Sequence, residues 1–84
     1  MAKYKVQLTT KAAKQFDKLP DSIAIPILEV IQNLENEPRP KGCKKLKARK
    51  GYRIRYRDYR IIYEIFDTYL LIDVLAIGHR KDIY

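Results

Sequence analysis

The sequence has no tryptophan, one cysteine, one histidine and three glycines among its 84 residues. Cys43 has no partner for an intrachain disulfide. One cysteine with one histidine is too few for the usual zinc site, so we expect no metal. A chain this short has room for one thin core but not for a cofactor cradle as well, so we expect no cofactor. The longest apolar runs, such as residues 70–72, stop at a charged residue, and residues 1–10 lack the apolar core of a signal peptide. These absences exclude a disulfide-stapled secreted fold and a membrane protein, and they predict a protein of the reducing cytoplasm.

The length and composition suit one small domain over residues 1–84. A chain of 84 residues buries roughly 60% of its unfolded surface when it folds. Its 46% hydrophobic residues are enough for one thin core, which excludes a disordered basic tail.

The positive charge is concentrated in one segment. The net charge is +8, and residues 39–60 hold eleven of the 18 basic residues but only one of the ten acidic residues, Asp58. Folded surfaces usually mix the two signs to limit self-repulsion. A block of one sign this dense is typical of a surface that meets a polyanion such as nucleic acid. A solvated segment that only raises solubility is the alternative.

A strand and a helix are predicted at the start of the chain. Apolar and polar residues alternate over residues 3–8, which predicts a half-buried strand. Thr9 or Thr10 then offers an N-cap for a helix over residues 11–19, and Pro20 ends that helix.

A second helix is predicted to begin at a cap on Asp21 or Ser22 and to end near Asn36. Residues 39–51 follow as a basic loop with room for a short strand at residues 45–46. The helix has an apolar stripe of Ala24, Ile27, Leu28, Ile31 and Leu34.

The C-terminal half is rich in β-branched and aromatic residues and predicts strands at Tyr52–Tyr56, Tyr59–Phe66 and 69–77. The connections between them are short, which favours hairpins and an antiparallel meander. The predicted fold class is therefore α+β. It combines a small, mostly antiparallel sheet, made of the N-terminal strand and the three-stranded meander, with two helices packed on one face.

The first predicted hairpin has a register with one apolar and one basic face. A two-residue connection pairs Tyr52 with Tyr63 and Ile54 with Ile61, which gives an apolar face for the helices to cover. The opposite face carries Arg53, Arg55, Arg60 and Glu64.

The second predicted hairpin pairs Tyr63 with Ile72 and Ile61 with Val74. That register leaves a second apolar group on the basic face, which would need cover from the C-terminal residues or from a partner. The group consists of Ile62, Leu71, Leu75 and Ile77.

In the predicted register of the first hairpin, Arg55 lies directly across from Arg60. This pair indicates an anion-binding surface. Like charges directly opposite on a sheet are destabilising, so selection for stability alone would not place them there. A phosphate would relieve the repulsion, because planar guanidinium groups match phosphate oxygens. Further phosphate-binding candidates are Arg53, Lys44, Lys45 and Lys47.

The last residues carry the other candidate reactive groups, His79, Arg80 and Tyr84. Histidine is the side chain that most often transfers protons near neutral pH, and the basic strand face lies close to it in the predicted sheet. A surface histidine and a frayed terminal tyrosine are the alternatives.

The run GYRIRYRDYRIIYEI at residues 51–65, followed by IGHRKDIY at residues 77–84, resembles the RelE/ParE superfamily of toxins from bacterial and archaeal toxin–antitoxin pairs. The segments AAKQFDKLP at residues 12–20 and KKL at residues 44–46 also fit, so the resemblance spans the chain. It implies a small sheet with two helices on one face, in agreement with the predicted register.

RelE-like members are metal-independent ribonucleases that cut mRNA in the ribosomal A site by attack of a 2′-hydroxyl on the adjacent phosphate. The resemblance implies phosphate binding by Arg53 and Arg55. It implies catalysis by Arg60, Arg80, Tyr84 and His79. The strand positions are often lysines in the family, and an arginine stays protonated, so it cannot serve as an ordinary base. Base and acid duties then fall to Tyr84 together with either His79 or Arg80.

Two other functions stay open at this point. A ParE-like DNA gyrase inhibitor would need neither Tyr84 nor the arginine cluster, and the arginine-for-lysine changes would suit an inactive nucleic-acid-binding relative. Every one of these readings implies a cognate antitoxin with an acidic or amphipathic segment that covers this surface. Messenger RNA on the ribosome is the expected target, operator DNA would be contacted only through the antitoxin, and no membrane partner is expected.

Overall fold

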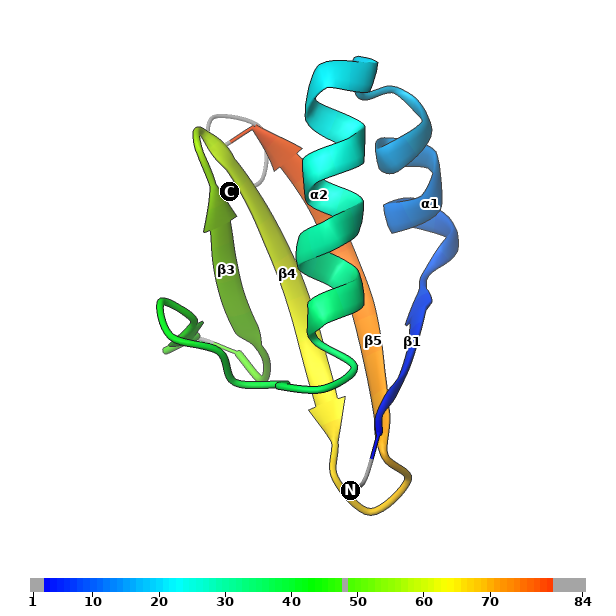
Figure 1. Cartoon of the computed structure of the whole chain (residues 1–84). Coiled ribbons are helices and arrows are strands. Elements are labelled where there is room, and N and C mark those ends of the chain that lie inside the picture. The colour runs from blue at the N-terminus through cyan, green and yellow to red at the C-terminus, as the bar shows by residue number, and fades with distance from the viewer. Residues whose placement is uncertain (1–2, 48, 80–84) are drawn as a thin grey trace.

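A computed structural model describes residues 3–47 and 49–79, and this part of the chain forms two helices and one five-stranded sheet. Both helices lie against the same face of the sheet, which we call the helix face (Figure 1). Strand β1 runs parallel to β5 at one edge, and the other neighbouring strands are antiparallel. The predicted α+β class is confirmed, with strand order β1-β5-β4-β3-β2. The elements are β1 (Lys5–Leu8), α1 (Thr10–Asp17), α2 (Asp21–Asn33), β2 (Lys44–Lys45), β3 (Tyr52–Tyr56), β4 (Tyr59–Phe66) and β5 (Leu71–His79).

The two helices begin differently. Thr9 is the N-cap of α1, as predicted, and its Oγ1 accepts a hydrogen bond from the Ala12 backbone N–H at 3.1 Å. The N-cap of α2 is Pro20, with no side-chain hydrogen bond, so the predicted cap at Asp21 or Ser22 is wrong. Asp21 lies in the first turn instead, where its negative charge is favourable beside the positive end of the helix dipole. Neither described helix has the length and hydropathy that a membrane span requires.

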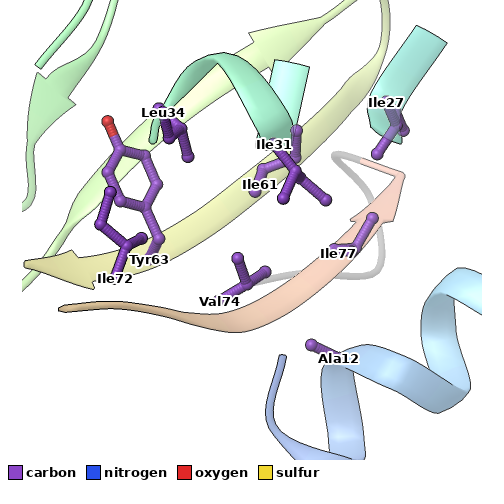
Figure 2. Packing of buried hydrophobic residues seen from close by; sticks show 9 residues of the cluster. All are labelled: Ala12, Ile27, Ile31, Leu34, Ile61, Tyr63, Ile72, Val74 and Ile77. Atoms are coloured by element: carbon purple, nitrogen blue, oxygen red, sulfur yellow. The ribbon is translucent and has the colours of Figure 1, made fainter. Parts of the chain in front are cut away.

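The core lies between α2 and the strands β4 and β5. Ile27, Ile31 and Leu34 of α2 point toward β4 and β5, and Ala12 of α1 closes one side (Figure 2). The predicted stripe is wrong at Leu28, which is 42% exposed because the buried side of α2 is centred on Ile27, Ile31 and Leu34. The strands contribute Ile61, Tyr63, Ile72, Val74 and Ile77.

The β3–β4 hairpin has the predicted register. Tyr52 pairs with Tyr63, Ile54 with Ile61, and the two-residue connection begins with Arg57 at φ 53°. A positive φ at the first loop residue matches the twist of the two strands in hairpins of this length. Alternate residues of a strand leave the same face. The apolar residues of this hairpin that were predicted to face the helices therefore all lie on the helix face.

The β4–β5 hairpin differs from the prediction. Its loop spans residues 67–70, because Leu70 adopts φ 51° and β5 begins only at the next residue. Tyr63 therefore pairs with Val74, two residues further along β5 than predicted. A register shift follows between Ile62 and Tyr63, so that Leu75 has no partner on β4 and forms a bulge.

The bulge reverses the faces of the last residues of β5. Ile77 now lies on the helix face and is 1% exposed, which corrects its predicted place on the opposite face. The rest of that predicted apolar group is not an exposed patch either, because Ile62 is 3% exposed and Leu71 and Leu75 are half-buried. The large apolar side chains that are exposed among the described residues lie elsewhere, at Ile25, Leu28, Tyr69 and Leu70.

Side chains of the α1 region hold the bulge and the end of β5 in place. The Thr9 hydroxyl donates to the Leu75 carbonyl at 3.2 Å, and the Ile77 backbone N–H donates to Gln15 Oε1 at 2.8 Å. Strand β1 pairs with β5 only as far as Val74, so backbone groups beyond that point need other partners. Thr9, the N-cap of α1, and Gln15 of α1 supply such partners at Leu75 and Ile77, just before His79.

Candidate functional site

Two arginines on neighbouring strands form the centre of the site. Arg55 of β3 and Arg60 of β4 are Cα partners, as predicted, so both side chains leave the same face of the sheet. Together with Arg57 and Asp58 of the turn they line a notch of about 30 Å³. That volume suits one group of about the size of a water molecule.

The other predicted phosphate-binding residues divide between the two faces. Arg53 lies two residues before Arg55 on β3, so it shares the face of Arg55. Lys44 is the Cα partner of Arg53 and joins it, whereas Lys45 pairs with Tyr52, which is on the helix face. Lys47 follows β2, is exposed, and belongs to neither face by register. We call the surface that carries Lys44, Arg53, Arg55 and Arg60 the arginine face.

The arginine face has an acidic end. Glu64 of β4 is the Cα partner of Asp73 of β5 on this same face. From the rise of a strand, this pair lies about 13 Å along β4 from Arg60. The face presents positive charge at the β3–β4 turn and negative charge toward the other end, which would favour one orientation of a bound polyanion.

His79 does not join the arginines. It is the Cα partner of Tyr59 on the helix face, and the two rings meet edge to face with centroids 5.6 Å apart. Without the bulge at Leu75, His79 would have been on the arginine face. No feature of the sequence signals that bulge, so its place could not be predicted. Arg80 and Tyr84, the other two predicted catalytic residues beside Arg60, lie outside the described residues.

Arg39 belongs to the basic segment of residues 39–60, but its charge is balanced by an ion pair. Its guanidinium donates to both carboxylate oxygens of Asp67, at 2.9 and 3.4 Å, and to the Tyr52 hydroxyl at 3.1 Å. Tyr4 donates to the same carboxylate at 2.6 Å. These hydrogen bonds, led by that of Arg39, hold the pKa of Asp67 below its usual range. Arg39 thus ties the basic loop to the β4–β5 turn. Its partners lie far away in the sequence, so sequence analysis missed this role.

Two further residues fix the loop that leads into β3. Gly51 has φ 122°, and a Cβ there would come within 2.9 Å of the Tyr63 backbone oxygen, so a side chain does not fit. The Tyr63 hydroxyl donates to the Pro38 carbonyl at 2.8 Å, and burial raises the pKa of this tyrosine. Tyr63 is therefore a structural residue that stays protonated, and it is no candidate for the reacting groups.

A comparison with known protein families assigns the chain to one of them. A family model described as the ParE toxin of the type II toxin–antitoxin system parDE matches residues 6–84. The chain belongs to the RelE/ParE superfamily of type II toxins. The resemblance found in the sequence is thereby confirmed, and the protein is the toxin of a toxin–antitoxin pair.

Individual relatives of the toxin are similar over nearly their whole length. Toxin RelG of Mycobacterium tuberculosis is 32% identical over 83 residues, which cover 96% of this chain and 95% of RelG. The crystal structure of the M. tuberculosis toxin–antitoxin complex RelBE2 superposes with a TM-score of 0.84, 32% identity and coverage of 98% and 97%. The archaeal RelE–RelB complex of Pyrococcus horikoshii OT3 gives a TM-score of 0.83, 30% identity and coverage of 98% and 99%.

Proposed function

We propose that this toxin is a metal-independent endoribonuclease that cuts mRNA in the ribosomal A site and thereby inhibits translation. The observation that carries the proposal is the Cα pairing of Arg55 with Arg60, which keeps two guanidinium groups on one face of a rigid sheet. The similarity to Toxin RelG over nearly the whole chain supports the RelE-like branch of the superfamily. Such a target would place the toxin in the cytoplasm.

The chemistry needs groups that bind phosphate and groups that move protons. The 2′-oxygen of one nucleotide forms a bond to the adjacent phosphorus, and the bond from phosphorus to the 5′-oxygen of the next nucleotide breaks. The products are a 2′,3′-cyclic phosphate and a 5′-hydroxyl. Negative charge grows on the phosphate oxygens in the transition state, where fixed guanidinium groups stabilise it without reorganisation. Arg55 and Arg60 are assigned this role, with Arg53 and Lys44 binding the flanking phosphates.

The proton transfers are assigned to the end of the chain. A base must take the proton of the 2′-hydroxyl, and an arginine stays protonated and cannot do so. We assign the base to Tyr84, because the resemblance implies catalysis by this residue and a tyrosine hydroxyl, unlike a guanidinium, can exchange its proton. Arg80 is assigned to the leaving 5′-oxygen, where its charge stabilises the developing negative charge, and that oxygen takes its proton from water. His79 lies on the helix face beside Tyr59, so we leave it out of the proton transfers.

An antitoxin is the second partner of this surface. The two solved complexes named above each hold a toxin with its antitoxin. We propose that an acidic or amphipathic segment of a cognate antitoxin covers the arginine face, where it would exclude RNA. Contact with operator DNA would come through the antitoxin alone.

The test is a toeprint on mRNA-programmed bacterial ribosomes in their usual Mg²⁺ buffer, with purified toxin that has been stripped of metal by EDTA and then freed of the chelator. We expect a cut in the A site that the stripped toxin makes as fast as the untreated toxin, and that is lost in Arg60→Ala and in Tyr84→Phe. Arg49→Ala is the matched control, because it removes an exposed arginine of the basic loop that lies outside the arginine face, and it should cut normally. A toxin that cuts only after a metal ion is returned to it, or a cut that Arg60→Ala leaves intact, would contradict the mechanism.

A gyrase inhibitor is the second candidate, favoured by the ParE description of the matching family. A toxin that binds its antitoxin and does not cut mRNA on ribosomes would shift the assignment to this function. A DNA supercoiling assay with purified gyrase then decides, since an inhibitor blocks supercoiling and an inactive relative does not. Arg60→Ala should leave such inhibition unchanged, because this function does not need the arginine pair.

A further inference from the structure

A second hollow lies at the same end of the sheet as the arginine pair, but on the helix face. Its volume is about 250 Å³, and its wall includes Gln15, Lys18 and Leu19 from the α1–α2 corner. Tyr59 and His79 line it from the strands. Sites for drug-sized ligands are typically about 300–1,000 Å³. This hollow therefore suits one smaller ring system.

The lining offers the contacts that a nucleobase requires. The Tyr59 and His79 rings are held at 80° to each other, so a planar ring can stack on one and meet the edge of the other. Gln15 is fixed by the 2.8 Å hydrogen bond that its Oε1 accepts from Ile77, which leaves its amide group as a hydrogen-bond donor of defined position. Lys18 adds a positive charge at the rim, and Leu19 adds an apolar wall.

The hollow is lined by the residue pair of β4 and β5 that directly adjoins Arg60. Tyr59 pairs with His79, and the adjoining pair is Arg60 with Gly78. Successive side chains of a strand leave opposite faces, so Arg60 and Tyr59 lie on either side of β4 at its first two positions. A single strand of RNA that bends around this end of the sheet could place a phosphate on the arginine face and a neighbouring base in the hollow.

We propose that this hollow is a nucleobase-binding subsite, which takes one splayed base of single-stranded RNA next to the phosphate held by Arg60. The inference rests on the proposed RNA substrate, and it gives His79 and Tyr59 a role in holding RNA rather than in moving protons. Proteins that bind single-stranded RNA commonly stack unpaired bases on aromatic side chains in this manner. The two rings are held in place for this role, because Thr9 anchors the bulge that moves His79 off the arginine face and Gln15 anchors the backbone at Ile77.

The first test is an NMR titration of the unmodified toxin with adenosine 5′-monophosphate and, separately, with ribose 5-phosphate. The two probes share sugar and phosphate and differ only in the base. We expect saturable shifts of the Tyr59 and His79 ring protons with the nucleotide and none with the sugar phosphate. Both probes should shift the side-chain resonances of Arg55 and Arg60. Absence of ring shifts up to the solubility limit of the nucleotide, or equal ring shifts with both probes, would overturn the subsite.

The second test measures the anisotropy of a labelled short oligoribonucleotide and of the same oligonucleotide lacking one base. Tyr59→Leu should weaken binding of the intact strand about tenfold and leave binding of the abasic strand unchanged. Tyr69→Leu is the matched control, because Tyr69 is 76% exposed in the turn at the other end of the sheet, and it should bind both strands normally. Equal losses for the two strands in Tyr59→Leu would contradict the proposal. The nucleotide titration needs no variant, so a folding defect in Tyr59→Leu does not leave the question undecided.

These experiments separate the subsite from the proposed enzyme. Base-dependent ring shifts in a toxin that does not cut ribosomal mRNA would keep the subsite and reject the ribonuclease. An A-site cut without any ring shift would keep the ribonuclease and reject the subsite.

Discussion

The two faces of the sheet are built from alternate residues of the same strands, yet they differ in nearly every physical respect. On the helix face, Ile61 and Tyr63 of β4 are fully buried beneath α2. On the arginine face, Arg60 of the same strand stands across from Arg55, and Glu64 stands across from Asp73. One face therefore holds most of the apolar contacts that stabilise the fold, and the other holds pairs of like charge, which are unfavourable directly across a sheet.

This difference separates stability from function in a very small protein. An 84-residue chain has one thin core, so the helix face must supply most of the free energy of unfolding. The arginine face can then carry repulsive charge pairs because the opposite face outweighs them. If this division is correct, substitutions on the two faces will change different measured quantities.

The largest expected effect is on the helix face. Ile61→Ala removes a fully buried side chain and should lower the free energy of unfolding by about 4 kcal/mol, measured by urea denaturation. Ile25→Ala is the matched control, because Ile25 is 62% exposed on α2, and its change should stay below about 0.5 kcal/mol. RNA cleavage per folded molecule should not change in either variant. If Ile61→Ala lost more cleavage activity than its loss of folded protein explains, stability and function would not be divided between the two faces.

The next largest effect is expected on the arginine face. Arg55→Gln removes one charge of the Arg55–Arg60 pair from an exposed position. The rate of mRNA cleavage should fall by at least about tenfold, since a charged hydrogen bond to phosphate contributes about 1.5–3 kcal/mol. The free energy of unfolding should stay the same or rise slightly, because a repulsion is removed. A clear loss of stability with unchanged cleavage would show that the arginine pair is structural.

A smaller effect is expected at the bulge at Leu75, which determines the face on which the last residues of β5 lie. Thr9→Val removes both the hydrogen bond to the Ala12 N–H and the one to the Leu75 carbonyl, and should cost about 1–2 kcal/mol in thermal or urea denaturation. Thr10→Val is the matched control at an exposed helix position, and it should cost less. We also expect weaker ring contacts between Tyr59 and His79 in the Thr9 variant, measured by NMR. Unchanged ring contacts would mean that the bulge does not depend on this threonine.

The smallest effect concerns the ion pair that ties the basic loop to the sheet. The pKa of Asp67 is lowered in the folded state, so its contribution to stability is present above the unfolded pKa and is lost as the pH falls through the folded pKa. Asp67→Asn should therefore lower the melting temperature slightly near neutral pH. The difference from the wild type should vanish in acid. Glu37→Gln, an exposed carboxylate just before Arg39, should show no such pH-dependent difference.

Much of the arginine face was predictable from local sequence. The two-residue connection between β3 and β4 leaves little freedom in register, so the period-two alternation of arginine with apolar residues places Arg55 across from Arg60 without further information. The Thr9 cap and the buried positions of α2 at Ile27, Ile31 and Leu34 follow from short-range patterns in the same manner. These features depend on residues that are close together in the chain.

The place of His79 depended instead on contacts between distant parts of the chain. The loop before β5 is longer than its sequence suggests because Leu70 turns to positive φ, and its backbone carbonyl accepts from Lys5 N–H at 2.8 Å. The bulge at Leu75 is held by Thr9, and the end of β5 is held by Gln15. Sequence patterns predicted the elements and the basic surface, because strand and helix periodicity are local properties. Only tertiary structure decided which face His79 occupies, because one unpaired residue in a strand reverses every side chain after it.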